Sequence, residues 1–500
     1  MRVTIPQLCL LSALFSLIPL NIPAIEVIDE VSNQHLFNET TQGLDIGHTF
    51  SKSGDNQTLA ILGRSGDVVI RGRRIAKIQA SFEIDSETSI VMFYDRSHSY
   101  TSRISGQNAT PFEHGRPRKV VVLPGHNTMI GMGGITLEIA KGRLDSSLQM
   151  NPVFDRTIED DGDTVVPSQR EARIHTPWPQ QPIVRYAKIN PLGSDQFGEV
   201  YRAVNMHTGK ILAVKSLKRS VHTSEDAKRY KVMKREVEIF TRLSHTHIVD
   251  CIGAQIQDSG EVKILMGLKE GTLQSFVEGG NPMDQHKLGR TVLNHMLQAL
   301  DYLAKQGLVH RDVKPANILY VSRPDGLHFQ LGDFGLSNHE VNAQTFAGTV
   351  VYMAPEMWTR KKTHKADVWS LYVTILWAED VQGFRARSEQ FKIPDDARNV
   401  IQTIASSTLH YFSTIRHMVN NDPEERPSAA QLLTKYFGGK GISTEADQIS
   451  SNVPDTIVLA ERSPTELNIG RPQTTNRDTA RRSHRIQKLR LPAIQAVRAS

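Results

Sequence analysis

The feature that most constrains the fold is a polar, proline-rich segment over 143–182, which separates two different sequence patterns. It contains EDDGD and PWPQQP and has too little apolar content to build a core. Before it, short β-rich runs alternate with turn residues, and after it strands are followed by helices. A chain of 500 residues also exceeds one ordinary core. The sequence therefore predicts a multidomain protein, with domains over 15–142 and 183–438.

The first domain shows the strand pattern. Between 57 and 140 the runs are TLAILG, DVVIR, KIQASFEI, SIVMFYD, RKVVVLPG and TMIGMGG. Several short strands at this spacing, bounded by turn residues, predict an all-β sandwich.

The N-terminal run LCLLSALFSLIPL has two readings. With Arg2 before it and the small residues IPA after it, the run has the form of a secretory signal. Thirteen residues are too few to span a bilayer as a helix, and the run passes without a break into the first domain. We favour a hydrophobic first strand. Only Cys9 and Cys251 are present, which favours a reducing compartment, cytoplasmic or nuclear, and no internal stretch predicts a membrane span.

The second domain begins with strands at VYRAV and ILAVKSL, followed by a predicted helix over 224–243 with Ser224 as N-cap. Further on, apolar residues recur at helical spacing, which favours a core helix over a ligand site. These residues are Leu288, Val292, Leu293, Met296, Leu297, Leu300 and Leu303.

The charge is concentrated at the C-terminal end. The formal net charge is +6, and 471–490 alone holds seven Lys or Arg against one acid, Asp478. The rest is close to neutral, so we expect no direct contact with nucleic acid. The tail over 439–500 is polar and aperiodic, which predicts disorder. Its basic stretch ARRSHRIQKLR is open to three readings: a nuclear-import signal, a binding patch or, most commonly, a solvated tail.

A glycine-rich loop, LGSDQFGEV, opens the second domain's motifs. Gly193 and Gly198 are weak alone, and Asp195 stands where a second glycine of the pattern would be. The signal comes from the motifs that follow in order: LAVK with Lys215, REVEIF with Glu236, HRDVKPAN at 310–317, DFG at 333–335 and APE at 354–356.

This ordered set resembles the protein-kinase signature over roughly 183–438. The resemblance implies a bilobal α+β fold and transfer of the γ-phosphoryl group of ATP, with Mg²⁺, to protein substrates. The residues VKPAN after HRD, and GTVVYMAPE, are similar to the serine/threonine type. Each residue alone has an ordinary structural reading, but the joint order is hard to obtain by chance.

The chemistry explains the residue types. Phosphoryl transfer needs cations on the triphosphate and a group that orients the attacking hydroxyl. By resemblance, Asp312 orients the hydroxyl, Lys314 steadies the phosphate, Asn317 and Asp333 bind Mg²⁺, and Lys215 pairs with a helix glutamate. The residues assigned to ATP binding are Leu192, Gly193, Gly198, Val200, Ala213, Lys215, Glu236, Met266, Leu268 and Asp333.

Other positions match the family in part. Glu356 and Arg426 resemble its buried ion pair, and Asp367 resembles the aspartate that holds the catalytic-loop backbone. Two departures, Gly267 for a hinge acid and Tyr372 for a glycine, concern the adenine pocket and packing.

The activation segment carries Thr345 and Thr349. Thr345 lies where a phosphothreonine of this family often pairs with the arginine of HRD, here Arg311. The alternative is an ordinary exposed threonine.

The first domain resembles a forkhead-associated (FHA) domain. GRSGD with Arg64 is similar to its glycine-arginine opening, but Ala76, Lys77 and Gln79 replace the serine, arginine and histidine of the next motif. The resemblance implies a phosphothreonine partner read by Arg64, against which stands a structural or docking module.

The architecture is similar to checkpoint-type and fungal FHA kinases. The leading reading is a serine/threonine kinase in signalling, and the competing readings are a pseudokinase scaffold and a phosphothreonine-binding adaptor. Asp195 would repel phosphate oxygens, so Asp195→Gly is expected to lower the KM for ATP without changing the reaction.

Overall fold

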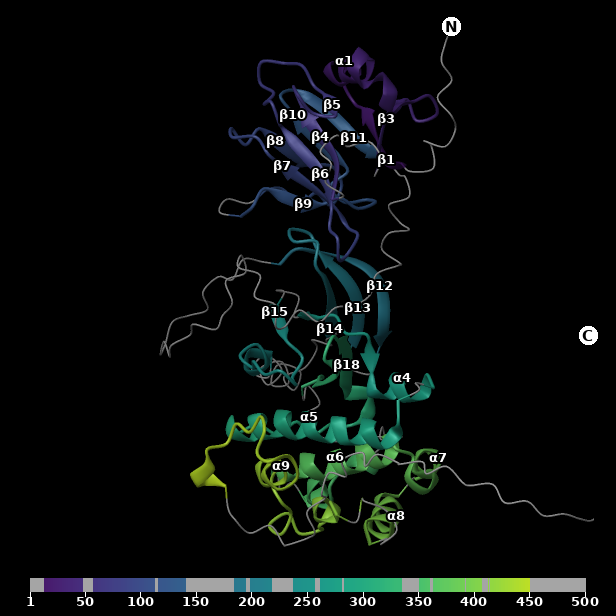
Figure 1. Cartoon of the computed structure of the whole chain (residues 1–500), viewed down its shortest axis with the longest axis vertical. Coiled ribbons are helices and arrows are strands. Elements are labelled where there is room, and N and C mark those ends of the chain that lie inside the picture. Colours follow the sequence, from purple (N-terminus) through teal and green to yellow (C-terminus); the bar gives the residue numbers. More distant parts are fainter. Residues whose placement is uncertain are drawn as a thin grey trace, which may run out of the picture. The chain divides into compact units, whose positions relative to one another are not determined.

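The computed structural model describes residues 13–47, 57–112, 116–140, 184–194, 198–217, 237–256, 261–280, 283–334, 350–359, 363–391, 393–406, 412 and 414–449 (Figure 1). The predicted linker and the tail beyond 449 therefore lie outside the described residues.

Two β-sheets form the N-terminal domain. The first contains, in spatial order, β2 (Phe37–Asn38), β3 (Gly43–Gly47), β1 (Ala13–Pro19), β11 (Ile135–Ala140), β10 (Met129–Met132) and β8 (Ser102–Ser105). The second contains β5 (Val68–Val69), β4 (Thr58–Gly63), β6 (Ala80–Ile84), β7 (Val91–Asp95) and β9 (Lys119–Val121). Phe15 of the first sheet and Phe82 of the second are buried in one core, with ring centroids 4.8 Å apart. The predicted sandwich is confirmed.

The N-terminal apolar run supplies β1, which pairs with both β3 and β11 at the centre of its sheet. The prediction of a hydrophobic first strand is thus confirmed for Ala13–Pro19, while the start of the run lies outside the described residues.

One element departs from the all-β expectation. Helix α1 (Ile22–Asp29), followed by the 3-10 turn η2 (Val31–Leu36), begins at Asn21, whose side chain accepts a hydrogen bond from the Ala24 N–H.

An antiparallel sheet of five strands opens the second domain. Its spatial order is β12 (Tyr186–Ser194), β13 (Gly198–Asn205), β14 (Ile211–Leu217), β16 (Val262–Gly267) and β15 (Cys251–Ile256). The predicted strand ILAVKSL coincides with β14. The predicted helix over 224–243 falls mostly outside the described residues, although 237–240 are helical.

The remainder of the second domain is mainly helical. Its helices are α4 (Leu273–Glu278), α5 (Gln285–Lys305), α6 (Lys365–Ala378), α7 (Phe384–Ser388), α8 (Pro394–Ser406) and α9 (Ala429–Phe437). A small sheet is formed by β17 (Gly271–Thr272), β18 (Ile318–Arg323) and β19 (Gly326–Leu331), and 3-10 turns are η3 (Pro315–Asn317), η4 (Val350–Tyr352), η5 (Pro355–Thr359), η6 (Val381–Gly383), η8 (Arg416–Val419) and η9 (Ala446–Gln448).

Helix α5 organises this lobe, because it packs against α6, α9 and β19 (Figure 1). Every residue of the apolar stripe predicted from the sequence is buried on α5, so the core-helix reading is confirmed. Asp284 caps the helix by accepting a hydrogen bond from the Lys287 N–H at 2.8 Å. Helix α6 is buried on nearly all sides and forms the centre of the core.

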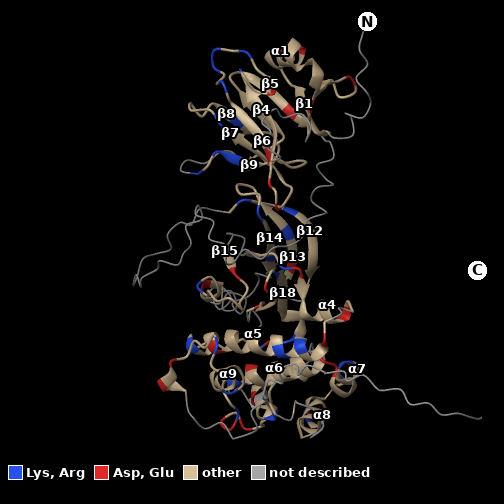
Figure 2. Cartoon of the chain, in the orientation of Figure 1, with Lys and Arg blue, Asp and Glu red and all other residues tan. Residues whose placement is uncertain are grey.

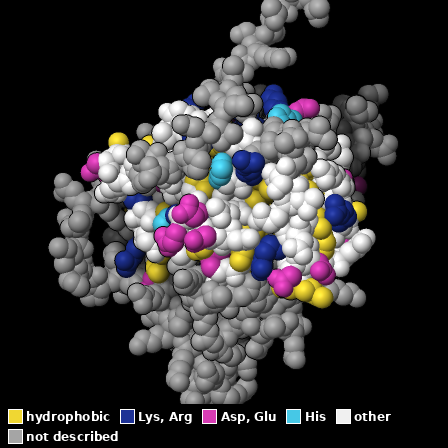
Figure 3. Space-filling view, turned by 90° about the horizontal axis from the view of Figure 1, so that it is seen from below, with side chains coloured by type: hydrophobic (Ala, Val, Ile, Leu, Met, Phe, Trp, Pro, Cys, Tyr) yellow, Lys and Arg dark blue, Asp and Glu magenta, His cyan; other side chains and the backbone are white. Residues whose placement is uncertain are grey.

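Charged residues of both signs are spread over the described parts of both domains (Figure 2). The face seen from below in Figure 3 likewise carries both signs of charge, and the residues drawn in colour do not form a surface of one sign. Within the described ranges, no helix combines the length and apolarity needed to cross a bilayer.

Candidate active site

An ion pair joins the two lobes of the second domain. Lys215 on β14 lies with its Nζ 2.7 Å from Oδ1 of Asp333, which follows β19. The lysine side chain is only 7% exposed. Asp333 has φ +55°, a backbone conformation that non-glycine residues rarely adopt. Glu236, the partner expected for Lys215, lies outside the described residues.

The catalytic loop brings three predicted residues together. Lys314 Nζ lies 2.8 Å from Asp312 Oδ2. The side-chain amide of Asn317, in η3, donates to the same Oδ2 atom and to the Asp312 carbonyl oxygen, both at 2.8 Å. Because Asn317 donates both contacts through Nδ2, its amide oxygen is the atom suited to a cation.

Asp367 holds the backbone of this loop, as the sequence predicted. Its carboxylate accepts hydrogen bonds from the backbone N–H groups of His310 and Arg311, both at 2.7 Å. Burial raises the pKa of Asp367, and the positive charges and N–H donors of His310 and Arg311 act against that rise. Arg311 has φ +71°, so these bonds restrain an uncommon backbone conformation.

His310 connects the catalytic loop to the segment between the end of β19 and Asp333. Its Nε2 lies 2.9 Å from the Gly332 carbonyl oxygen, and its Nδ1 accepts from the Asp312 N–H at 3.3 Å. The two contacts together require the tautomer with hydrogen on Nε2. Sequence reasoning missed this role, because the link depends on a contact between residues 22 positions apart.

Aromatic rings extend this connection. The ring of Phe334, beside Asp333, lies 5.0 Å from His310 in an edge-on arrangement. On its other side it stacks at 5.0 Å on Phe240, in the segment that follows Glu236. The position of Asp333 is therefore coupled through packing to the helical residues 237–240. No spacing in the sequence indicated this stack.

The two glycines of the glycine loop have different physical reasons. A Cβ atom at Gly198 would lie 2.1 Å from the Ser216 carbonyl oxygen, so the close approach of β14 requires glycine there. A Cβ at Gly193 would meet nothing within 4 Å. Gly193 pairs with Val200 across β12 and β13, and Leu192 is 49% exposed. Asp195 lies outside the described residues.

The residues assigned to the adenine side of the nucleotide site lie on β14 and β16 or directly after β16. Ala213 on β14 pairs directly with Met266 on β16, and Leu268 follows that strand. Ala213 and Leu268 are both buried. At Gly267, a Cβ would lie 2.6 Å from Asp250 Oδ1, which explains why no side chain stands there.

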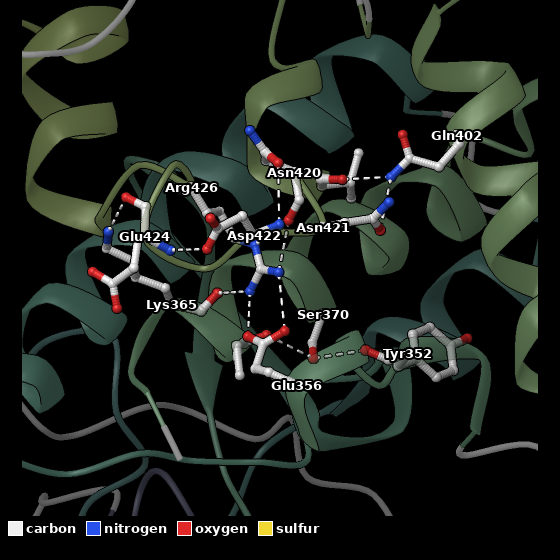
Figure 4. A network of polar contacts seen from close by, with 12 residues as sticks. Tyr352, Glu356, Lys365, Ser370, Gln402, Asn420, Asn421, Asp422, Glu424 and Arg426 are labelled. Atoms are coloured by element: carbon white, nitrogen blue, oxygen red, sulfur yellow. Dashed lines mark hydrogen bonds and ion pairs between the residues drawn. The ribbon is translucent and has the colours of Figure 1, made fainter. Parts of the chain in front are cut away.

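A buried ion pair anchors the helical lobe, as the sequence predicted (Figure 4). Arg426 contacts both carboxylate oxygens of Glu356, at 2.5 and 3.1 Å. The same guanidinium donates to the carbonyl oxygens of Lys365 and Asn420 and lies 5.2 Å from the Trp369 ring centre. The Arg426 side chain is fully buried, so its charge depends on these contacts.

Of the remaining sequence predictions, the one at Tyr372 can be placed. Tyr372 is fully buried in α6 with its ring 5.5 Å from Phe412, so its departure from the family pattern concerns packing, as expected. Thr345 and Thr349 lie outside the described residues.

The donor set fits magnesium. Asp333 and Asn317 offer hard oxygen ligands, and magnesium commonly takes only one or two protein ligands together with phosphate oxygens and water. The residues that the structure describes include no cluster of three or more His, Cys, Asp or Glu side chains arranged to hold a metal.

The model of the protein kinase domain family matches residues 186–437, which is half of the chain. The chain belongs to the protein kinase family. The kinase match begins at residue 186 and does not include the N-terminal sandwich. Members of this family use ATP and Mg²⁺.

Three relatives illustrate the similarity. Human serine/threonine-protein kinase 10 is 29% identical over 274 residues, covering 52% of this chain and 27% of the relative. The Dictyostelium discoideum serine/threonine-protein kinase dst1 is 27% identical over 270 residues, 52% of this chain and 35% of the relative. Mouse mitogen-activated protein kinase kinase kinase 4 is 30% identical over 273 residues, 51% of this chain and 16% of the relative. The chain thus spans about a third or less of the length of these three proteins.

Proposed function

We propose that this kinase is catalytically active and transfers the γ-phosphoryl group of ATP to serine or threonine hydroxyls of protein substrates. The observation that carries the proposal is the convergence of Asp312, Lys314 and Asn317 in one hydrogen-bonded group, with Lys215 and Asp333 in a second. Residues 15–142 and 183–438 are the proposed domain limits, and a cytoplasmic or nuclear location is proposed from the cysteine content.

Each residue has a role that its contacts support. Asp312 orients the attacking hydroxyl and accepts its proton, because its carboxylate is held by Asn317 and Lys314. Lys314, within reach of that carboxylate, neutralises charge that develops on the transferred phosphate. Magnesium, when bound, neutralises the triphosphate, and Asp333 with Asn317 would hold it.

Lys215 is proposed to move between two partners. Its Nζ contacts Asp333 in this structure, and in a nucleotide complex its charge would serve the phosphates. The nucleotide would be enclosed by Leu192, Gly193, Gly198, Val200, Ala213, Met266 and Leu268, with Glu236 as the second partner of the lysine.

Labelled ATP, Mg²⁺ and a generic protein substrate test the proposal. The wild-type chain should incorporate label, and Lys215→Ala and Asp333→Ala should each reduce incorporation by about a hundredfold or more. Lys305→Ala is the matched control, because Lys305 forms only an exposed pair with Glu445 on the outside of the helical lobe. Background incorporation by wild type and both cleft variants would identify a pseudokinase scaffold instead.

Phosphorylation of Thr345 is a second part of the proposal. Arg311 has a buried Nε without a hydrogen-bond partner among the described residues, which is a position suited to an anionic acceptor. A phosphate on Thr345 would supply it. Mass spectrometry of the active enzyme should find modified Thr345, and fully active protein with unmodified Thr345 would contradict the role.

For the sandwich we propose an FHA-like domain with a phosphothreonine partner. Arg64 and Lys77 are both exposed, and their loops are joined by hydrogen bonds from the N–H groups of Arg64 and Ser65 to the carbonyl oxygens of Ala76 and Lys77. Gln79 bonds through its side-chain amide to Thr101 and Ser102, so a neutral residue organises the loops here. Two exposed cations on neighbouring loops form a basic point suited to phosphate.

A phosphothreonine peptide array probed with the full chain tests this second proposal. Arg64→Ala should abolish phosphate-dependent binding, and Arg103→Ala, on β8, is the control. Equal retention of phosphorylated and unphosphorylated peptides by the wild-type chain would favour a docking module without phosphate recognition.

A further inference from the structure

The connection between the two kinase lobes is held on both sides by neighbouring residues of opposite charge. It runs over 268–270, between β16 and β17. On one side, Lys269 Nζ lies 3.2 Å from Asp250 Oδ1. On the other, the Glu270 carboxylate accepts hydrogen bonds from the Ser322 N–H at 2.6 Å and the Ser322 hydroxyl at 2.9 Å. Lys269 is thus tied to the start of β15 and Glu270 to β18.

The Lys269 contact depends on a glycine. Cys251 pairs with Met266 across β15 and β16, which places Asp250 opposite Gly267. The Asp250 carboxylate occupies the space that a side chain at position 267 would need, since a Cβ there would lie 2.6 Å from Oδ1. Gly267, Asp250 and Lys269 therefore form one arrangement, in which the missing side chain lets the carboxylate reach the lysine.

The burial of Lys269 makes this contact energetically significant. Its side chain is 1% exposed, whereas that of Asp250 is 33% exposed. A buried ammonium is costly to keep charged, so the loss of one anionic partner weakens its hold and favours movement toward its other contacts or toward water. Loss of Asp250 should therefore displace Lys269 and the backbone on either side of it, including Leu268 on the adenine side.

Asp250 also connects to the metal side of the cleft. The residue before it, Val249, donates its N–H to the Leu331 carbonyl oxygen at 3.0 Å. The Leu331 N–H in turn donates to the His247 carbonyl oxygen at 2.9 Å. Leu331 is two residues before Asp333. The ion pair thus joins the segment beside Leu268 to the segment bonded to the strand that positions Asp333.

We propose that Asp250 and Lys269 are positioning residues that set the affinity for nucleotide by fixing the connection at Leu268 relative to Asp333. This inference rests on the proposed nucleotide site, but it concerns binding and does not require phosphate transfer. Gly267 is part of the arrangement, because the absence of a side chain there leaves room for the Asp250 carboxylate.

Calorimetric titration of the full chain with ATP and Mg²⁺ tests the proposal, alongside KM and kcat for phosphate transfer. Lys269→Met, Asp250→Asn and Gly267→Ala should each raise the Kd and KM for ATP about fivefold, the effect of a partly buried ion pair, and leave kcat within about twofold. Lys263→Met, on β16, is the control, because Lys263 pairs with Glu261 away from the connection.

The double variant Asp250→Lys with Lys269→Asp provides the decisive comparison, since it restores opposite charges in reversed order. Recovery of most of the lost affinity supports the proposal. Unchanged Kd in the single variants, or no recovery in the reversed pair, would overturn it. If the wild-type chain binds ATP, the variants change the Kd as expected and no phosphate is transferred, only the proposed activity is refuted. If the wild-type chain binds no ATP, both proposals are refuted.

Discussion

The kinase domain and the sandwich both contain buried carboxylates bonded to arginine, but these carboxylates have different surroundings. In the kinase domain, Glu356 and Asp367 hold the framework, while Asp312 and Asp333 remain partly exposed. In the sandwich, the Asp95 carboxylate is fully used by structural contacts. It accepts hydrogen bonds from the side chains of Ser97, Ser102 and Arg118. The difference indicates where chemistry can occur, because a reactive or ligand-binding charge needs both support and access.

The largest effect expected from this contrast is on Asp312. Asp312→Asn keeps the size of the side chain but removes the carboxylate that orients the substrate hydroxyl. We expect kcat to fall by about a thousandfold with little change in the Kd for ATP. Steady-state kinetics and calorimetric ATP binding measure the two quantities. A kcat within tenfold of wild type would place the essential carboxylate elsewhere.

The two arginine pairs give the next prediction. Arg426→Met leaves the Glu356 charge buried and should lower the free energy of unfolding of the kinase domain by about 3–5 kcal/mol. Arg118→Met should cost only about 1–2 kcal/mol, because Asp95 retains its serine donors and Arg118 is 21% exposed.

Denaturant unfolding distinguishes the two variants. The described tryptophans, including the buried Trp369 and Trp377, all lie in the kinase domain, so their fluorescence follows Arg426→Met. Far-UV circular dichroism follows Arg118→Met in the sandwich. Equal losses of unfolding free energy in the two variants would contradict the prediction that the more deeply buried pair contributes more.

Much of this contrast could be predicted from the sequence, because the cleft residues stand in motifs of fixed order and charge. The apolar patterns predicted strand β14 and the core face of α5. The motif positions predicted the contacts of Asp367 and Arg426. Helix α1, the Phe240–Phe334 stack and the Asp250–Lys269 pair did not. Those features depend on which distant segments meet in space, and local spacing carries no information about that.

A stack of histidines behind the cleft gives a pH-dependent prediction confined to the kinase domain. The rings of His247 and His295 lie 4.0 Å apart, with His328, His245 and Arg323 nearby and Asp325 paired to His328. Burial lowers the pKa of His247 to about 4 and that of His295 to about 3. Both rings are therefore neutral in the folded protein at pH values where an unfolded histidine, with pKa about 6.5, gains a proton.

The sign of the effect follows from that difference. Stability is fully present above about pH 6.5 and is lost as the pH falls toward 4, at about 2 kcal/mol for one ring between pH 7 and 5. Replacing one ring, as in His295→Phe, should flatten the profile by that amount. Tryptophan-detected unfolding at both pH values measures it, and parallel profiles for variant and wild type would contradict the assignment.

The smallest effect concerns Asp195, the one departure in the glycine loop. In the sandwich, the neutral Gln79 stands at a position that departs from the FHA pattern and donates hydrogen bonds to Thr101 and Ser102. An aspartate at this motif position is instead expected to turn its carboxylate toward solvent, so its repulsion of phosphate should be weak, roughly 0.5–1 kcal/mol. Asp195→Gly should then lower the KM for ATP about two- to fivefold at low salt and less at high salt, with kcat unchanged. An unchanged KM at both salt concentrations would mean that the Asp195 carboxylate does not meet the phosphates and that the glycine loop tolerates this departure from its motif.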